Sequence, residues 1–240
     1  MRSVVMVSGS GTNLQAILDA QIADLEIVAV VSDNPEAYGL QRAIDAGITA
    51  ITVDYQSFAK RSDFDDALYA AIEQIKPDLI VLAGFMRILA GDLVNRYDGR
   101  MINIHPSLLP AYPGLNTHQR AIDAGEQWHG TTVHFVIPKL DAGPSIVQYQ
   151  VAIRPSDTAE SLADRVRIGE YLIYPQAIAM LTSGQLKLEN NVVYNNGQEL
   201  AAPEVLHEQI LAGSICGLQF DNTLARQTKG LKLIAKFEGK

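Results

Sequence analysis

The chain has 240 residues, of which 48% are hydrophobic and 19% charged, and this composition indicates a folded globular protein rather than a disordered one. The formal net charge of -8 argues against a general nucleic-acid or anionic-membrane binder, because such binding depends on Lys and Arg. The single cysteine, Cys216, excludes an intrachain disulfide and a cysteine zinc cluster. No apolar run is long enough for a membrane span or a signal peptide, so we expect a cytoplasmic protein.

The first part of the chain alternates short apolar runs with amphipathic segments. The runs that predict strands are residues 4–8, 27–32, 51–53, 78–83 and 101–104. The segments that predict helices are residues 14–20, 40–46 and 64–75. Near-continuous apolar strands that alternate with helices are typical of a parallel sheet covered on both faces. We therefore expect an α/β fold with a Rossmann-like, mostly parallel sheet.

The pattern changes after residue 130. Residues 131–137 and 145–153 are strand-like, and the loop between them is too short for a helical crossover, so these strands are expected to be antiparallel. Residues 158–180 predict a long helix that Asp157 or Thr158 could cap. From about residue 185 the sequence is more polar and less regular, with a hairpin expected at residues 192–197.

The most informative motif ends the fifth predicted strand, where the run Asn-Ile-His-Pro contains Asn103, His105 and Pro106. Residues i and i+2 of a strand point to the same face, so Asn103 and His105 project together where Pro106 ends the pairing. An amide donor beside an imidazole can stabilise an oxyanion and move a proton. Asp141, in a later Asp-Ala-Gly-Pro run, could favour the charged imidazole, or could be a solvated carboxylate in a turn.

A glycine-rich run, Ser-Gly-Ser-Gly-Thr-Asn, lies between the first predicted strand and the first predicted helix at residues 8–13. Glycines let the backbone approach an anion, and the helix N-terminus offers free N–H groups, so the run suits a phosphate or a mononucleotide. A dinucleotide site is an alternative, because Gly9, Gly11 and Asp33 fit part of its fingerprint, although Leu14 occupies the third glycine position. A tight turn without a ligand also fits.

The run Gly-Phe-Met-Arg-Ile-Leu, residues 84–89, follows the fourth predicted strand, at the carboxyl end of which ligands bind in parallel sheets. Apolar side chains around Arg87 suit a flat heteroaromatic ligand with polar edges, although the run alone is more typical of core packing with a surface arginine. The other histidines lack a convergent context and are expected to be structural or exposed; these are His118, His129, His134 and His207. His134, inside a strand, could instead line a pocket. We predict no catalytic metal, because no set of His and carboxylate residues has zinc spacing.

Taken together, these motifs resemble the phosphoribosylglycinamide formyltransferase family, also called glycinamide ribonucleotide transformylase. The resemblance covers residues 8 to about 190 and is carried by SGSGTNLQAI, VLAGFMRIL, INIHPSLLPAYPGLNTHQRAIDAG, HGTTVHFV, DAGP and DTAESLADRV. It implies an enzyme of purine biosynthesis that transfers the formyl group of 10-formyltetrahydrofolate, its co-substrate, to the amine of glycinamide ribonucleotide. It also implies a catalytic domain of residues 1–190, with residues 191–240 as a C-terminal extension of unknown role.

The resemblance assigns a role to each motif. The implied catalytic residues are Asn103, His105 and Asp141. The implied nucleotide-binding residues are Gly11, Thr12 and Asn13 at the phosphate and Glu170 near the ribose. The implied folate-binding residues are Arg61, Met86, Arg87, Ile88, Leu89 and Asn103. The expected partners are these small molecules, with neither nucleic acid nor membrane, for a monomer or a homodimer.

Other readings of the same motifs remain open. Methionyl-tRNA formyltransferase shares the Asn-x-His arrangement, but it usually carries a longer C-terminal domain, and its tRNA suits a more basic surface. Formyltetrahydrofolate hydrolase is also similar and typically adds an N-terminal regulatory domain, for which we expect no room before the first strand. A non-catalytic nucleotide-binding protein would keep the glycine run without needing Asn103, His105 and Asp141 together.

Overall fold

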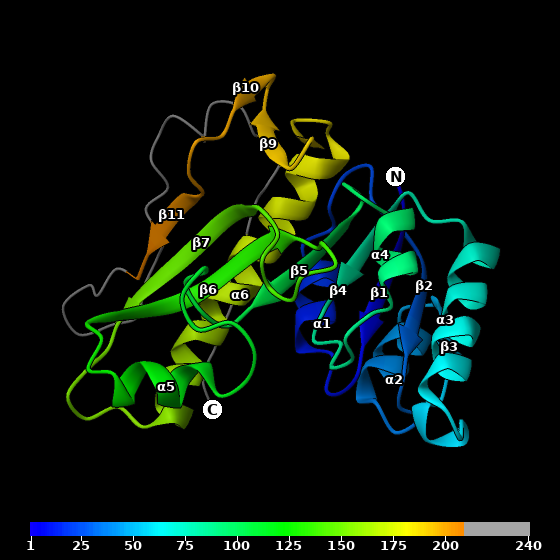
Figure 1. The fold of residues 1–240 in the computed structure, drawn as a ribbon, viewed down its shortest axis with the longest axis horizontal. Coiled ribbons are helices and arrows are strands. Elements are labelled where there is room, and N and C mark those ends of the chain that lie inside the picture. The colour runs from blue at the N-terminus through cyan, green and yellow to red at the C-terminus, as the bar shows by residue number, and fades with distance from the viewer. Residues whose placement is uncertain (209–240) are drawn as a thin grey trace.

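The computed structural model describes residues 1–208 and is built on an eight-stranded sheet of order β11-β7-β6-β5-β4-β1-β2-β3 (Figure 1). The strands of this sheet are β1 (Arg2–Val7), β2 (Glu26–Ser32), β3 (Thr49–Thr52), β4 (Leu79–Leu82), β5 (Met101–His105), β6 (Trp128–Phe135), β7 (Ser145–Ala152) and β11 (Glu204–His207). Strands β1 to β5 are mutually parallel, whereas β6 is antiparallel to both β5 and β7. The predicted mostly parallel α/β fold with an antiparallel part is confirmed.

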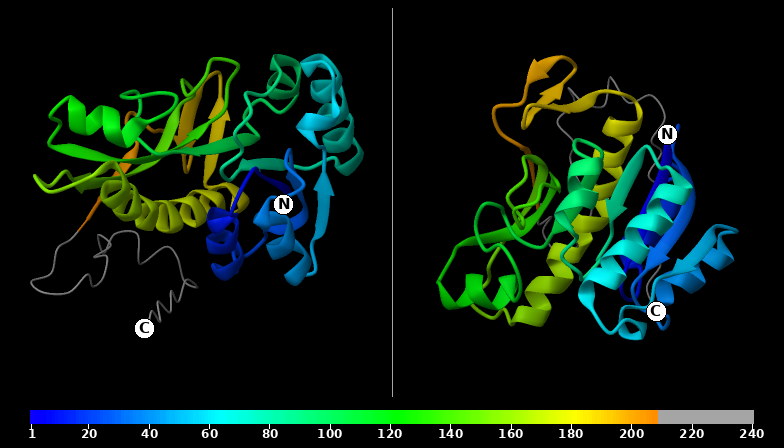
Figure 2. Two further views of the ribbon diagram at one scale, coloured as in Figure 1. Left: turned by 90° about the horizontal axis from the view of Figure 1, so that it is seen from below. Right: turned by 45° about the vertical axis from the view of Figure 1, so that its right-hand side comes forward.

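Helices cover both faces of this sheet, as the view from below in Figure 2 shows. The helices are α1 (Thr12–Asp19), α2 (Tyr38–Asp45), α3 (Arg61–Ile75), α4 (Gly91–Arg96), α5 (Thr117–Asp123) and α6 (Ala159–Thr182), with a short 3-10 helix, η1, at Tyr55–Ser57. Apolar residues of α1, α2 and α6 pack with one face of the sheet, and those of α3 and α4 pack with the other. Burial of each large apolar side chain contributes about 1.5–3 kcal/mol, so these two cores stabilise the sheet from both sides.

Helix α6 is fixed at its start and in its middle. Thr158 and Ser161 form a reciprocal capping box, so Thr158 caps the helix, and the alternative cap, Asp157, pairs instead with Arg165. Further along, the fully buried Tyr174 donates its hydroxyl hydrogen to the carbonyl oxygens of Leu82 and Ile102. Because those carbonyls belong to β4 and β5, the bonds hold the helix beneath the middle of the sheet.

The part of the chain after residue 185 is more regular than the sequence indicates. A small second sheet contains β8 (Leu186–Glu189), β9 (Val192–Asn195) and β10 (Gln198–Glu199), in which the predicted hairpin is β9 and β10. The last described strand, β11, then joins the main sheet by pairing in parallel with β7. The expected hairpin is present, and what the sequence did not predict is the strands on either side of it, β8 and β11. The exposure of β11 alternates along the strand, but its sequence, Glu-Val-Leu-His, does not alternate apolar with polar residues, so the pattern could not be read from the sequence.

Residues 209–240, which include Cys216, lie outside the described part of the chain. Within residues 1–208, no helix is both long enough and apolar enough to cross a membrane.

Candidate active site

Three of the motifs leave the sheet at the same edge. Strand β4 lies between β1 and β5, and the register pairs Leu82 with Met6 on one side and with Asn103 on the other. The glycine run follows β1, residues 84–89 follow β4, and Asn103 and His105 end β5. The carboxyl edge of a parallel sheet therefore gathers the candidate phosphate, folate and catalytic residues in one place.

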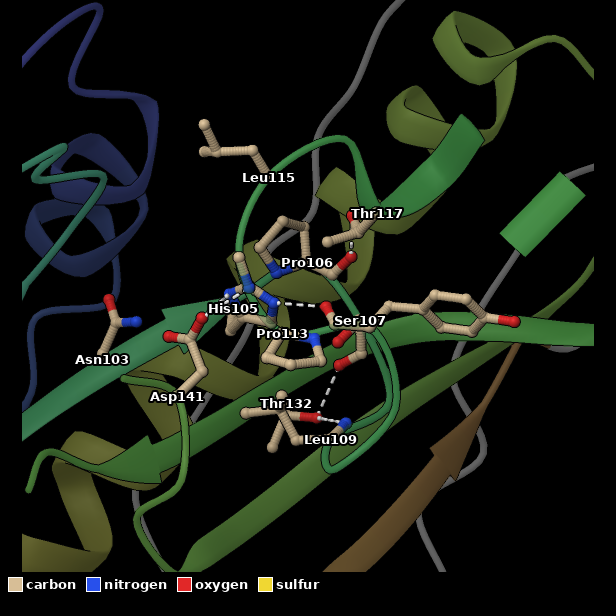
Figure 3. Close-up of polar contacts among 12 residues, drawn as sticks. Asn103, His105, Pro106, Ser107, Leu109, Pro113, Leu115, Thr117, Thr132 and Asp141 are labelled. Carbon is tan, nitrogen blue, oxygen red and sulfur yellow. Dashed lines mark hydrogen bonds and ion pairs between the residues drawn. The ribbon is translucent and has the colours of Figure 1, made fainter. Parts of the chain in front are cut away.

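Asn103, His105 and Asp141 converge at this edge (Figure 3). Asp141 lies on the loop between β6 and β7, and its Oδ2 atom is 3.5 Å from Nδ1 of His105. Both side chains are buried, at 8% exposed for His105 and 7% for Asp141. The same Oδ2 atom accepts a hydrogen bond of 2.8 Å from the backbone N–H of Gly114. Asp141 is therefore not the solvated turn carboxylate of the alternative reading.

Few residue types fit the loop that carries Asp141. Asp141 itself has φ of +49°, in the left-handed region that few residues other than glycine, asparagine and aspartate adopt. Two residues later, a Cβ atom on Gly143 would lie 1.8 Å from the carbonyl oxygen of Phe135. This close approach explains the glycine of the Asp-Ala-Gly-Pro run and fixes where the carboxylate enters the site.

The imidazole of His105 faces an acceptor on each nitrogen. Its Nε2 atom is 3.0 Å from the carbonyl oxygen of Tyr112, which can only accept, so Nε2 carries a hydrogen. Its Nδ1 atom faces the carboxylate of Asp141. The 3.5 Å between Nδ1 and Oδ2 is an ion-pair distance, so the carboxylate lies where it can stabilise positive charge that develops on the ring.

Hydroxyl groups of β6 and α5 hold the segment that follows His105. Thr131 donates to the carbonyl of His105 at 2.9 Å, and Thr132 donates to the carbonyl of Ser107 at 2.7 Å. Thr117, at the start of α5, donates to the carbonyl of Pro106 at 2.6 Å. Figure 3 shows Thr117 and Thr132 near the ring of His105. The backbone turn that presents His105 is thus fixed by buried hydrogen bonds and not by packing alone.

His134 belongs to the site, although the sequence predicted only a structural or exposed residue with a pocket position as the alternative. Its Nδ1 atom lies 2.8 Å from the carbonyl of Phe135 and therefore carries the hydrogen, which leaves Nε2 as an acceptor. The Nδ2 atom of Asn103 lies 3.2 Å from that Nε2. Burial lowers the pKa of His134 to about 4, which keeps the ring neutral and able to accept. The missing signal was the register of β5 with β6, which pairs Asn103 with His134.

The glycine run lines a pocket together with residues 83, 84 and 86. Gly11 has φ of +68°, and a Cβ atom there would lie 2.6 Å from the Cα atom of Gly39, so only glycine fits. Gly11 precedes the first turn of α1, and the N-terminal end of this helix has no side-chain cap and so offers free N–H groups. Asn13 donates from Nδ2 to Oε2 of Glu170 at 2.9 Å, and burial raises the pKa of this glutamate. Gly11, Thr12 and Asn13 thus lie together at this pocket, and Asn13 contacts Glu170.

A second pocket lies on the other side of residues 84–88. Its lining residues are Tyr55, Arg61, Phe64, Asp65, Met86, Arg87 and Ile88. Met86 lines both pockets. Four of the candidate folate residues therefore converge here, whereas Leu89 packs against the core under α3 and α4 and does not line the pocket.

Comparison with known proteins decides the family. The formyl transferase family profile matches residues 1–178. The chain belongs to the formyl transferase family. It is 44% identical to phosphoribosylglycinamide formyltransferase of Escherichia coli (strain K12), over 83% of this chain and 96% of that protein. It is also 44% identical to a trifunctional purine biosynthetic protein of Drosophila melanogaster, over 76% of this chain and 14% of that longer protein.

Solved structures of this family share the fold. The phosphoribosylglycinamide formyltransferase of Coxiella burnetii superposes with a TM-score of 0.81 at 48% identity, covering 85% of this chain and 98% of that one. A glycinamide ribonucleotide transformylase of Symbiobacterium toebii superposes with a TM-score of 0.77 at 42% identity, covering 81% of this chain and 93% of that one. Formyl transferase membership therefore holds at the level of both sequence and fold.

Proposed function

We infer that this formyl transferase transfers the formyl group of 10-formyltetrahydrofolate to the amine of N1-(5-phospho-D-ribosyl)glycinamide. The products are the N2-formyl nucleotide and tetrahydrofolate, and the step belongs to de novo purine biosynthesis. The observation that carries the proposal is the set of Asn103, His105 and Asp141, in which the side chains of His105 and Asp141 are buried, at the sheet edge from which the loops of two pockets arise. The relative in Escherichia coli, named for this activity, matches over nearly its whole length.

The pocket at the glycine run is the proposed nucleotide site. Backbone N–H groups at the start of α1 suit the phosphate, and Gly11 and Thr12 bring the backbone close enough to donate. Asn13 lines this pocket and donates to Glu170, so Asn13 is a proposed contact at the phosphate end and Glu170 the proposed contact near the ribose.

The second pocket is the proposed folate site. Met86 is 68% exposed and Ile88 55%, which gives the flat pterin an apolar surface, and backbone groups of residues 86–89 can bind its polar edges. The side chains of Arg61 and Arg87 are 52% and 39% exposed, so their guanidinium groups are available to the carboxylates of the folate tail. The side chain of Asn103 lies at the next strand end and can contact the formyl group.

The catalytic residues fit the chemistry of formyl transfer without a metal or a covalent enzyme intermediate. The nucleotide's amine attacks the formyl carbon, a C–N bond forms, and the carbonyl oxygen becomes an oxyanion. The charged His105 and the amide N–H of Asn103 that is not bonded to His134 can donate to this oxygen. The bond to folate N10 then breaks, and the amine's proton moves to N10 through groups that Asp141 orients. Asp141 thus stabilises the imidazolium and helps to transfer the proton.

The two rival formyltransferase-fold enzymes differ in what they need besides formyl folate. A hydrolase needs only water, and a tRNA enzyme needs charged initiator tRNA. Incubation with 10-formyltetrahydrofolate, with and without glycinamide ribonucleotide, distinguishes these cases through the release of tetrahydrofolate. Release that requires the nucleotide supports the proposal, whereas release without any amine acceptor indicates the hydrolase. We further propose a cytoplasmic enzyme, monomeric or homodimeric, that binds neither nucleic acid nor membranes.

A further inference from the structure

Asp33 was noted in the sequence only as a possible ribose ligand of a dinucleotide site. In the structure Asp33 directly follows β2 and is 3% exposed, and both of its carboxylate oxygens accept hydrogen bonds. Oδ1 accepts from the hydroxyl of Ser8 at 2.5 Å, and Oδ2 accepts from Nε of Arg87 at 2.7 Å. A carboxylate used in this way cannot also bind the two hydroxyls of a ribose. The dinucleotide reading of the glycine run is therefore contradicted, and Asp33 needs another explanation.

Ser8 connects the two pockets. It is the first residue of the glycine run, and its backbone N–H donates to the carbonyl of Gly84 at 3.1 Å. Its hydroxyl oxygen also accepts from the backbone N–H of Met86 at 2.8 Å while donating to Asp33. Ser8 thus bonds the turn at residues 84–86 from both ends, and Asp33 orients the hydroxyl that makes the second bond.

The carboxylate of Asp33 also fixes Arg87. The ion pair with Asp33 fixes Nε, and the guanidinium carbon lies 3.9 Å from the centre of the Tyr55 ring. The arginine side chain is nevertheless 39% exposed and lines the second pocket. The carboxylate and the ring therefore hold the guanidinium in one place while part of it still faces a ligand.

We propose that Ser8 and Asp33 are positioning residues for the formyl donor. They fix the backbone of residues 84–87 and the guanidinium of Arg87 before the donor binds, so that binding does not have to order this loop. The inference rests on the proposed folate site, to which it adds two residues that contact the donor only through Met86 and Arg87. Asp33 lines neither pocket, whereas Ser8 also lines the proposed nucleotide pocket, so the Asp33 variants separate the two substrates most clearly.

Three variants test this role by steady-state kinetics and calorimetry. Ser8→Ala removes the bond to Met86, Asp33→Ala frees both Ser8 and Arg87, and Asp33→Asn keeps one acceptor oxygen. Each alanine variant should raise the KM for 10-formyltetrahydrofolate and the Kd of tetrahydrofolate about tenfold. In the two Asp33 variants the KM for the nucleotide should change less than about twofold, because Asp33 lines neither pocket, and Asp33→Asn should recover part of the donor affinity. In the double variant the KM for 10-formyltetrahydrofolate should rise by less than the product of the two single increases, because Ser8 and Asp33 act as one unit.

A matched control is Glu73→Ala, which removes the ion pair with Arg96 and the hydrogen bond from the hydroxyl of Tyr97, away from both pockets. It should leave both KM values unchanged. Should Asp33→Ala fail to fold, Ser8→Ala and Asp33→Asn still carry the test. Unchanged donor affinity in folded variants, or equal losses for both substrates, would overturn the positioning role while leaving the proposed function intact. If instead the wild-type protein binds no tetrahydrofolate, the folate site itself is wrong.

Discussion

The neutral imidazole of His134 accepts a hydrogen bond from the side-chain amide of Asn103, with 3.2 Å between Nε2 and Nδ2. The bond leaves one amide hydrogen of Asn103 free for the developing oxyanion, and it fixes the direction in which that hydrogen points. His134 is itself fixed by the carbonyl of Phe135 on its other nitrogen. An oxyanion donor is effective only when it is oriented before the reaction, so we expect His134 to position Asn103 for the proposed transfer.

Replacement of His134 should therefore affect catalysis more than binding. In His134→Ala the amide of Asn103 loses its acceptor and can rotate, so kcat should fall about tenfold, with smaller changes in both KM values. The exposed His207 on β11 offers a control, and His207→Ala should leave kcat unchanged. A folded His134→Ala protein with wild-type kcat would contradict the orienting role.

The lowered pKa values of two buried histidines lead us to expect that the stability of the fold depends on pH. Burial lowers the pKa values of both His129 and His134 to about 4 in the folded protein, from the ordinary value of 6.5. Between these values the unfolded chain binds more protons, so the free energy of unfolding should decrease as the pH falls from 6.5 toward 4. His134→Asn should make the free energy of unfolding depend less steeply on pH, by about the contribution of one bound proton. Urea unfolding of both proteins across this range measures the difference, and parallel profiles would disagree with a neutral buried His134.

The sequence allows the main architecture and most of the site to be predicted, because those features depend on local patterns. Apolar runs predicted strands β1, β2, β4 and β5, and the spacing of Asn103 and His105 placed both on one face. The partners that were missed depend on contacts between distant segments. His134 reaches Asn103 only through the register of β5 with β6. The packing of the Leu89 side chain against the core likewise depends on distant segments, which a short apolar run cannot reveal, and its backbone stays a proposed folate contact.

The glycine run gives a prediction about binding. Gly11→Val places a branched side chain at φ of +68° and within 2.6 Å of Gly39, so the backbone of the run must shift. Nucleotide affinity should fall at least about tenfold, whereas tetrahydrofolate affinity should change little, because Gly11 does not line the second pocket. Calorimetric titration with each ligand measures both. Gly47→Val serves as a control, since Gly47 also has positive φ but has open space around its Cβ position. Equal losses of both ligands in Gly11→Val would indicate general unfolding instead.

The described part of the extension contributes to stability. Arg165 is 8% exposed and pairs with Asp157 and, at 2.9 Å, with Glu208, which follows β11. A chain ending at residue 200 lacks β11 and leaves the buried guanidinium with one carboxylate fewer, so we expect it to be less stable than a chain ending at residue 208.

The variant Glu208→Gln isolates the ion pair from the strand. It should lower the free energy of unfolding by about 1–3 kcal/mol, and the truncation at residue 200 should lower it by more. Urea unfolding of the two truncated chains and of the point variant provides the comparison. Equal stability of the chains ending at 200 and 208 would show that β11 adds nothing to the fold.

The most direct test of the account is the nucleotide-dependent transfer of formyl by the wild-type protein and by His105→Ala. In the proposed mechanism the imidazole of His105 donates to the oxyanion beside Asp141, so its removal should reduce kcat at least about 100-fold. Nucleotide affinity should stay within about twofold, because no proposed nucleotide contact is lost. A folded His105→Ala protein that transfers formyl at nearly the wild-type kcat would contradict the assignment of His105, Asn103 and Asp141 as the catalytic residues.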